Sequence, residues 1–142
     1  MVTKNRLVIG VVGNDIHIVG NRIIHIALEE KGFNVLNIGI NNPLTSFIQA
    51  AMEFNANAIL VSSINGEAES VCCDFRKKVS QHIHQPIKLY IGGNLVVGYR
   101  QAEAVESHFL SWGFDRVFHQ IDIHKAIVLI QKDLCLEGLA LV

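Results

Sequence analysis

The chain has 142 residues, of which 50% are hydrophobic and 18% are charged. This composition excludes an intrinsically disordered protein, and the length is most simply that of one domain with a well-filled core, so we expect a single domain over residues 1–142. Twelve Lys and Arg balance thirteen Asp and Glu without any basic run, which leaves no electrostatic footprint for binding nucleic acid.

Apolar, strand-like runs alternate with amphipathic helical stretches along the chain. In chain order we predict strand 7–12, helix 19–31, strand 34–38, helix 43–55, strand 58–62, helix 67–82, strand 87–91, helix 102–112, strand 116–118 and helix 123–135. Gly32 and Gly113 end two of these helices, because glycine readily adopts the left-handed conformation that follows many helix C-termini. Pro43 belongs at a helix start, where its missing N–H group leaves no hydrogen bond unmade.

The composition of the five strands predicts how they pair. The strands are nearly continuous runs of Val, Ile and Leu, which is typical of strands buried on both faces in a parallel sheet covered by helices. Right-handed crossovers then give an open, doubly wound sheet. We therefore expect an α/β protein with a flavodoxin-like (Rossmann-like) fold, five parallel strands in the order 2-1-3-4-5, and helices on both faces.

The loop after the first strand carries an imidazole and a carboxylate. Asp15 and His17 lie in this loop, and Gly20 follows at the start of the next helix. Ligands of such folds bind outside the carboxyl ends of the strands, near the switch point between the first and third strands. Histidine is the commonest side-chain metal ligand, and its second ring nitrogen usually donates to a carboxylate. The pattern therefore indicates a metal-ligating histidine held by an aspartate.

The loops after the third and fourth strands supply hydroxyl groups and closely approachable backbone. Ser62 and Ser63 follow the third strand-like run, and residues 92–98 (Gly-Gly-Asn-Leu-Val-Val-Gly) follow the fourth. With the first loop, they describe a slot for a large, flat, partly polar ligand that contains a metal. The chain has no Walker motif, and residues 10–13 do not match GxGxxG, so a nucleotide or nicotinamide ligand fits poorly.

Each of these residues also has an ordinary structural interpretation. A lone loop histidine is usually solvated or capping, Asp15 can cap the helix that follows, and Ser62 can bond to backbone at a strand end. Residues 92–93 can form a simple tight turn. The remaining histidines lie at the far side of the sheet, on helices, or at the ligand edge without further support: His82, His84, His25, His108, His119 and His124.

The cysteines and the N-terminal segment indicate in which cellular compartment the protein is expected. Cys72, Cys73 and Cys135 are odd in number and do not form a CxxC metal spacing, so they fit a reducing cytoplasm. The polar stretch before the first strand is too short for a signal peptide or a membrane span. We expect a cytoplasmic protein that contacts neither membrane nor nucleic acid.

In its three loop motifs the chain resembles the cobalamin-binding domain family. The matching motifs are DxHxxG at residues 15–20, the serine motif at 62–63 and the glycine pair at 92–93. The chain is further similar to the small subunits of glutamate mutase (methylaspartate mutase), at residues 32–39, 58–63, 90–98 and 113–117. The resemblance covers roughly residues 5–135 with almost no change in length, so it is far more specific than a lone motif.

The resemblance implies roles for individual residues. His17 corresponds to the lower axial ligand of cobalt, which displaces the cofactor's dimethylbenzimidazole base, and Asp15 to the carboxylate that holds this histidine. Gly20 corresponds to the glycine that leaves room for the nucleotide tail, and Ser62 to the serine that binds the displaced base. The implied cobalamin-binding residues, none of them catalytic, are Asn14, Asp15, Ile16, His17, Ile18, Gly20, Ser62, Ser63, Ile64, Gly92, Gly93, Asn94, Leu95, Val96, Val97 and Gly98.

The chain departs from the family pattern at two places. The family's Ser-x-Leu motif ends in Ile64 here, a change of shape at constant volume that should reshape the tail pocket without abolishing binding. Residues 118–123 replace a turn similar to Gly-Thr-Pro-Pro, so no contact to the tail is carried over onto them.

The resemblance also implies a function. Subunits of this kind hold adenosylcobalamin base-off for an isomerase that converts L-glutamate to threo-3-methylaspartate by radical rearrangement. The substrate site lies on a separate, barrel-type large subunit, which implies a heterotetramer of two small and two large subunits. Two alternatives stay open: a corrinoid methyl carrier, although the first strand leaves no room for the usual N-terminal helical bundle, and a cobalamin-sensing or regulatory domain without mutase activity.

Overall fold

The computed structural model describes residues 5–12, 18–63, 72–93, 102–119 and 122–134. Strands and helices alternate through these segments. The strands are β1 (Arg6–Val11), β2 (Asn34–Asn37), β3 (Ala58–Ser63), β4 (Lys88–Gly93) and β5 (Arg116–His119). The helices are α1 (Ile18–Glu30), α2 (Leu44–Phe54), α4 (Phe75–His82), α5 (Ala102–Ser111) and α6 (Ile123–Asp133).

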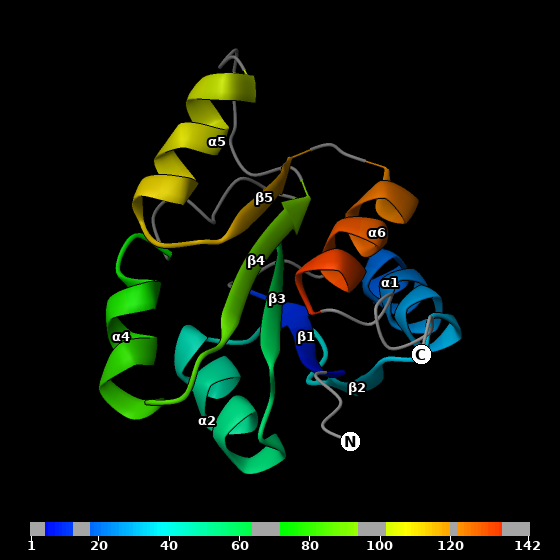
Figure 1. The fold of residues 1–142 in the computed structure, drawn as a ribbon, viewed down its shortest axis with the longest axis horizontal. Coiled ribbons are helices and arrows are strands. Elements are labelled where there is room, and N and C mark those ends of the chain that lie inside the picture. The colour runs from blue at the N-terminus through cyan, green and yellow to red at the C-terminus, as the bar shows by residue number, and fades with distance from the viewer. Residues whose placement is uncertain (1–4, 13–17, 64–71, 94–101, 120–121, 135–142) are drawn as a thin grey trace.

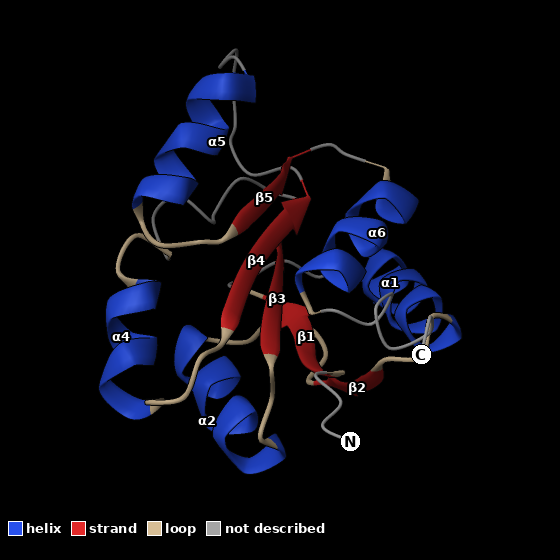
Figure 2. Cartoon of the chain, viewed as in Figure 1, coloured by secondary structure: helices blue, strands red, loops and turns tan. Residues whose placement is uncertain are grey.

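The five strands form one parallel sheet in the order β2-β1-β3-β4-β5 (Figure 2). This order confirms the predicted flavodoxin-like α/β fold. The register places Val11 opposite Ser62, Ser62 opposite Gly92, and Gly92 opposite Phe118. A single row of residues therefore crosses four strands at their carboxyl ends, where the sequence predicted a binding site.

Helices cover both faces of the sheet, which explains why the middles of its strands are apolar. Figure 1 shows α1 and α6 together on one face and α2, α4 and α5 on the other. The strand residues alternate between the two resulting cores. Along β1, Val8 packs into the core beneath α2, α4 and α5, whereas Leu7 and Ile9 pack into the core beneath α1 and α6.

Most predicted boundaries agree with the structure to within one or two residues, and two of the differences have a clear meaning. Helix α4 begins at Phe75, and the described residues 72–74 are not helical, so the prediction that a helix runs through them is wrong. Strand β4 continues through Gly92 and Gly93, which the sequence placed after it. Both glycines pair with β3 and β5 on either side, and this pairing outweighs the low intrinsic strand preference of glycine.

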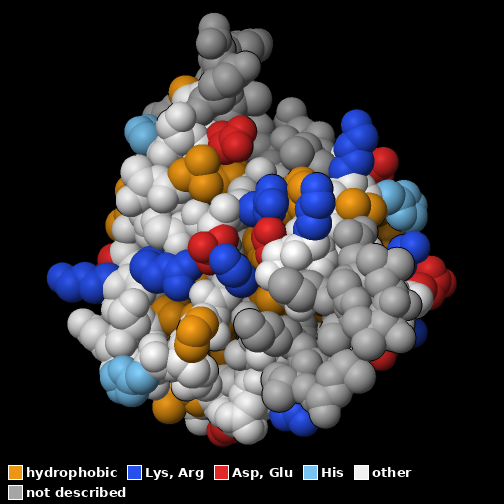
Figure 3. Space-filling view, in the orientation of Figure 1, with side chains coloured by type: hydrophobic (Ala, Val, Ile, Leu, Met, Phe, Trp, Pro, Cys, Tyr) orange, Lys and Arg blue, Asp and Glu red, His pale blue; other side chains and the backbone are white. Residues whose placement is uncertain are grey.

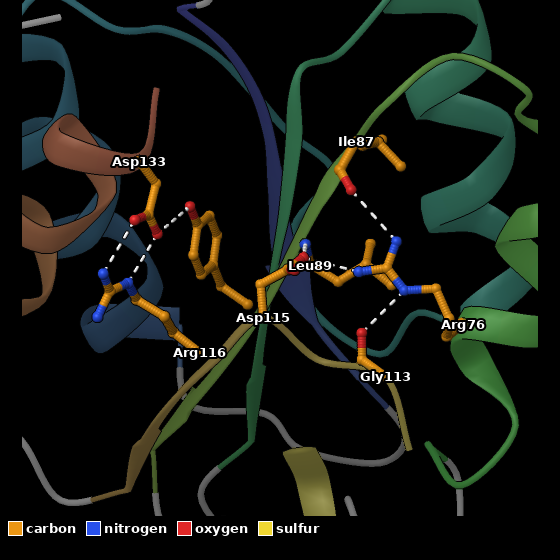
Figure 4. Close-up of polar contacts among 8 residues, drawn as sticks. Arg76, Ile87, Leu89, Gly113, Asp115, Arg116 and Asp133 are labelled. Atoms are coloured by element: carbon orange, nitrogen blue, oxygen red, sulfur yellow. Dashed lines mark hydrogen bonds and ion pairs between the residues drawn. The ribbon is translucent and has the colours of Figure 1, made fainter. Parts of the chain in front are cut away.

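Arg76 ties α4 to the amino-terminal end of the sheet. Its side chain forms an ion pair with Asp115, with 2.7 Å between Nη2 and Oδ2. It also donates to the backbone carbonyl oxygens of Gly113 at 2.8 Å and Ile87 at 3.2 Å (Figure 4). These bonds fix the connections that lead into β4 and β5.

Asp133 ties the last turn of α6 to β4 and β5. Arg116 donates to both of its carboxylate oxygens, at 2.7 and 2.9 Å, as Figure 4 shows. The hydroxyl of Tyr90 donates to Oδ2 of Asp133 at 2.8 Å. The ring of Tyr90 also stacks on Phe118, with 5.8 Å between the ring centroids. The hydrogen bonds of Asp133 therefore fix the position of α6 relative to β4 and β5.

The surface agrees with the balanced composition. On the face shown in Figure 3, basic side chains lie beside acidic ones. No helix in the described parts of the chain is both long and apolar enough to span a membrane.

Candidate functional site

A cavity of about 170 Å³ lies between α1, α6 and the carboxyl ends of the strands. Its floor is formed by the row that crosses the sheet, together with two residues beside it: Val11, Ser62, Gly92, Phe118, Leu60 and Gly93. The strands β1 and β3 lie at the switch point of the strand order. The cavity is therefore where ligands of doubly wound sheets bind.

The two helices provide mostly apolar walls. Helix α1 contributes Gly20, Asn21 and Ile24, and helix α6 contributes Ile123, Ala126, Ile127 and Ile130. Ser62 and Asn21 are the polar side chains among the lining residues. An apolar slot with two polar groups fits a flat, mainly apolar group that carries a few polar atoms.

Two glycines keep this cavity open. A Cβ atom built on Gly20 would meet no atom within 4 Å, and one on Gly92 would lie 3.5 Å from the Cβ of Phe118, which is an ordinary contact. Neither position therefore requires glycine for packing. Because both line the cavity, a side chain at either would occupy space that is open to a ligand.

Gly93 is glycine for a different reason. Its φ is +108°, and a Cβ atom there would collide with the carbonyl oxygen of Ser63 on the neighbouring strand. The backbone conformation and the close approach of β3 both demand glycine. Gly93 lines the cavity, but its residue type follows from the fold.

The two serines at the end of β3 point in different directions. Successive residues of a strand face opposite sides of the sheet, and Ser62 lines the cavity whereas Ser63 does not. Ser63 is fully buried, and its Oγ has no hydrogen-bond partner among the described residues. The structure thus brings Ser62 to the candidate site but not the side chain of Ser63.

Asn21 is a site residue that the sequence analysis missed. It is only 5% exposed, and its Nδ2 donates to Oδ1 of Asn37 at 2.8 Å. Asn37 lies 3.1 Å from His25, which in turn lies 3.1 Å from Glu29. A single asparagine inside a helix has no periodicity that would mark it, so its position became visible only in the folded chain.

The cavity wall that α6 provides was also not predicted from the sequence. The 4- and 3-residue spacing of Ile123, Ile127 and Ile130 is typical of an apolar helix face, but this pattern does not tell a core from a cavity wall. Phe118 and Ile123 line the cavity, although the sequence analysis carried no ligand contact onto residues 118–123.

The predicted metal ligand lies outside the described residues. That ligand is His17, and the same holds for several other predicted site residues: Asn14, Asp15, Ile16, Ile64, Asn94, Leu95, Val96, Val97 and Gly98. Ile18 is the first residue of α1. Within the described segments, no three His, Cys, Asp or Glu side chains are grouped so that they could hold a metal ion.

Three other histidines and the buried cysteine do not line the cavity. His82, His84 and His124 are exposed, and none of them lines it. Burial raises the pKa of the Cys72 thiol to about 12, with smaller contributions from Cys73 and Asp74. Cys72 is therefore an inert core residue at neutral pH.

Comparison with known proteins places these features in a family. The model of the B12 binding domain family matches residues 5–116. The glutamate mutase sigma subunit of Fusobacterium nucleatum subsp. nucleatum is 45% identical over 131 residues, which cover 92% of this chain and 96% of that protein. The glutamate mutase sigma subunit of Treponema denticola is 47% identical over 118 residues, which cover 83% and 85%.

Solved structures share the fold at lower identity. A cobalamin-binding protein from Desulfitobacterium hafniense DCB-2 matches with a TM-score of 0.72 and 20% identity, over 92% of this chain and 59% of that one. A response regulator of the LuxR family from Staphylococcus aureus matches with a TM-score of 0.59 and 14% identity, over 90% and 97%. At such identities these similarities show the shared fold alone.

Proposed function

The chain belongs to the B12 binding domain family and to the glutamate mutase sigma subunits, and on this basis we propose that it binds adenosylcobalamin for the rearrangement of L-glutamate to threo-3-methylaspartate. The observation that carries the proposal is the cavity between α1, α6 and the sheet. Its shape and its chemistry can be compared with the nucleotide tail of the cofactor.

The described residues fit that tail. Dimethylbenzimidazole is flat and apolar and has one free ring nitrogen when it is displaced from cobalt. The apolar walls suit the ring, and the hydroxyl of Ser62 on the floor can donate to that nitrogen. Gly20 and Gly92 leave the space that the ring needs. We propose that these three residues, with Gly93, hold the displaced tail.

We propose that His17 is the lower ligand of cobalt and that Asp15 holds its ring. His17 directly precedes α1, which begins at Ile18, and only three residue steps separate it from Gly20 on the cavity wall. Three steps of chain reach at most about 11 Å. The cobalt and the displaced tail would therefore lie on neighbouring parts of one site.

The contribution of this chain is to bind and orient the cofactor. Bound adenosylcobalamin supplies the cobalt–carbon bond whose cleavage starts the radical rearrangement. We propose that the substrate site lies on a separate, barrel-type large subunit and that two small and two large subunits form a heterotetramer. The other proposed binding residues on this chain are Asn14, Ile16, Ile18, Ile64 and residues 94–98. The side chain of Ser63 is not among them, because it does not line the cavity.

A visible absorption titration tests the proposal. The purified chain is titrated with cobalamin beside His17→Ala and the matched control His84→Ala, whose exposed histidine does not line the cavity. We expect wild type and His84→Ala to give the spectrum of a base-off corrinoid with histidine bound to cobalt. His17→Ala should not give it, because the ligand is missing.

Two results would count against the proposal. If the wild-type chain gives no spectral change at any cobalamin concentration, the proposal that it binds cobalamin is refuted. If His17→Ala gives the same titration as the wild type, the chain binds cobalamin but His17 is not the cobalt ligand.

A further inference from the structure

One buried polar atom at the wall of the cavity lacks a partner. Asn21 is 5% exposed, and its Oδ1 accepts no hydrogen bond from any described residue. Buried polar groups in folded proteins are nearly always paired, because an unpaired group loses its bonds to water without replacement. The described residues therefore leave this acceptor beside the cavity free for a ligand donor.

The orientation of the Asn21 amide follows from its neighbours. The backbone N–H of Gly39 can only donate, and it lies 2.9 Å from Oδ1 of Asn37. That contact identifies the oxygen of Asn37, which also accepts from Nδ2 of Asn21 at 2.8 Å. Asn21 therefore directs its nitrogen at Asn37, and its oxygen is the atom left over.

A chain of hydrogen bonds then holds Asn37 in place. Because the oxygen of Asn37 is identified, its Nδ2 must be the atom 3.1 Å from Nδ1 of His25, so Nδ1 accepts. The ring of His25 then carries its proton on Nε2, which lies 3.1 Å from Oε1 of Glu29. Each of these contacts pairs a donor with an acceptor, and the amide of Asn21 has one orientation.

Asn21 separates two spaces in the structure. It lines the cavity, and it also lines the surface hollow where His25, Glu29 and Asn37 lie. Its nitrogen is directed at Asn37 on the side of the hollow, which leaves its oxygen on the other arm of the amide, buried and without a partner among the described residues. We propose that Oδ1 of Asn21 accepts a hydrogen bond from the nucleotide tail of the corrinoid, which makes Asn21 a specificity-determining residue.

The chemistry of the tail limits the donor. Dimethylbenzimidazole has no N–H group, whereas the ribose of the tail has free hydroxyl groups. The hydroxyl of Ser62 can serve the base nitrogen, and the carbonyl of Asn21 is left for a ribose hydroxyl. Cobinamide, which lacks the whole nucleotide, cannot make this bond. This inference rests on the proposed function, because it needs the tail to enter the cavity.

Dissociation constants for cobalamin and cobinamide test the inference. Both are measured for wild type, Asn21→Ala and the control Asn37→Ala, which breaks the same Asn21–Asn37 bond but keeps the carbonyl of Asn21. We expect Asn21→Ala to weaken cobalamin binding about tenfold, the effect of one lost hydrogen bond. Asn37→Ala keeps that carbonyl but no longer fixes its direction, so it should weaken cobalamin binding by a smaller factor, and cobinamide binding should be the same for Asn21→Ala and wild type.

The outcomes separate this inference from the function on which it rests. An unchanged cobalamin affinity of Asn21→Ala, an equal loss in both asparagine variants, or a loss of cobinamide binding by the same factor would each overturn the role of Asn21 alone. Absence of cobalamin binding by the wild type would overturn the proposed function together with this inference. If Asn21→Ala does not fold, Asn21→Ser gives the same test, because its shorter hydroxyl cannot replace the amide oxygen.

Discussion

Replacing Asp133 by alanine should destabilise the fold by about 3 kcal/mol. The carboxylate accepts from Tyr90 on β4 and from two nitrogens of Arg116 on β5. Tyr90 is fully buried, so the substitution leaves its hydroxyl without a partner, at about 1–3 kcal/mol. Arg116 is 35% exposed and returns to water, so the loss of that ion pair adds at most about 1 kcal/mol.

Urea unfolding of a double-mutant cycle measures this effect. Tyr90→Phe alone should lower the free energy of unfolding by about 1 kcal/mol, because Asp133 keeps both bonds to Arg116. The double variant should be about 1–2 kcal/mol more stable than Asp133→Ala, since no hydroxyl is then left unpaired. Additive losses of about 4 kcal/mol in the double variant would refute the proposed coupling.

The same contacts predict a pH dependence. Hydrogen bonds from Arg116, which outweigh the opposing effect of burial, lower the pKa of Asp133 below its usual value. The stabilisation is therefore complete above the unfolded pKa of about 4 and is lost as the pH falls through the lower folded pKa. Asp133→Asn should lose less stability than wild type between about pH 4 and pH 2. Parallel curves for the two proteins would contradict this assignment.

Three further substitutions or probes test the site and its surroundings. Gly93→Ala should lower the free energy of unfolding by more than about 2 kcal/mol, because its Cβ collides with Ser63 and its φ is +108°. Gly20→Ala should raise that free energy by about 0.5–1 kcal/mol, since helical glycine is unfavourable and its surroundings are open, yet it should weaken cobalamin binding. In alkylation at pH 8 followed by peptide mapping, exposed Cys73 should react well before Cys72, whose pKa is raised to about 12.

Each of these predictions has a contrary result. Gly92→Ala is the matched control for Gly93→Ala, because its Cβ would make only an ordinary contact; equal destabilisation of the two would show that the collision is not the cause. Undiminished cobalamin binding by Gly20→Ala would mean that the tail does not enter the cavity. Alkylation of Cys72 as fast as Cys73 would show that its surroundings open readily.

The fold could be predicted because its signals are local. Strands buried on both faces need apolar residues at every position, and this pattern identified the parallel sheet and its helical cover. The boundary at β4 could not be predicted in the same way. Gly92 and Gly93 look like a turn in isolation, and only their pairing with β3 and β5 makes them strand residues.

The site could be predicted only in part. Ser62, Gly20 and Gly92, which line the candidate cavity, were singled out in the sequence by their places in the three loop motifs. Ser63 was grouped with Ser62 because the predicted strand stopped one residue early, which hid the alternation of their side chains. Asn21 depends on Asn37, a contact between α1 and β2 that arises only in the folded chain.

Reconstitution tests the central claim most directly. The purified chain is mixed with the large subunit of a glutamate mutase, adenosylcobalamin and L-glutamate, and the product is followed by proton NMR. The account predicts 3-methylaspartate only when all components are present, and little of it with His17→Ala. A chain that binds cobalamin but forms no product with any such large subunit would contradict the mutase function, and would favour a corrinoid carrier or a cobalamin sensor.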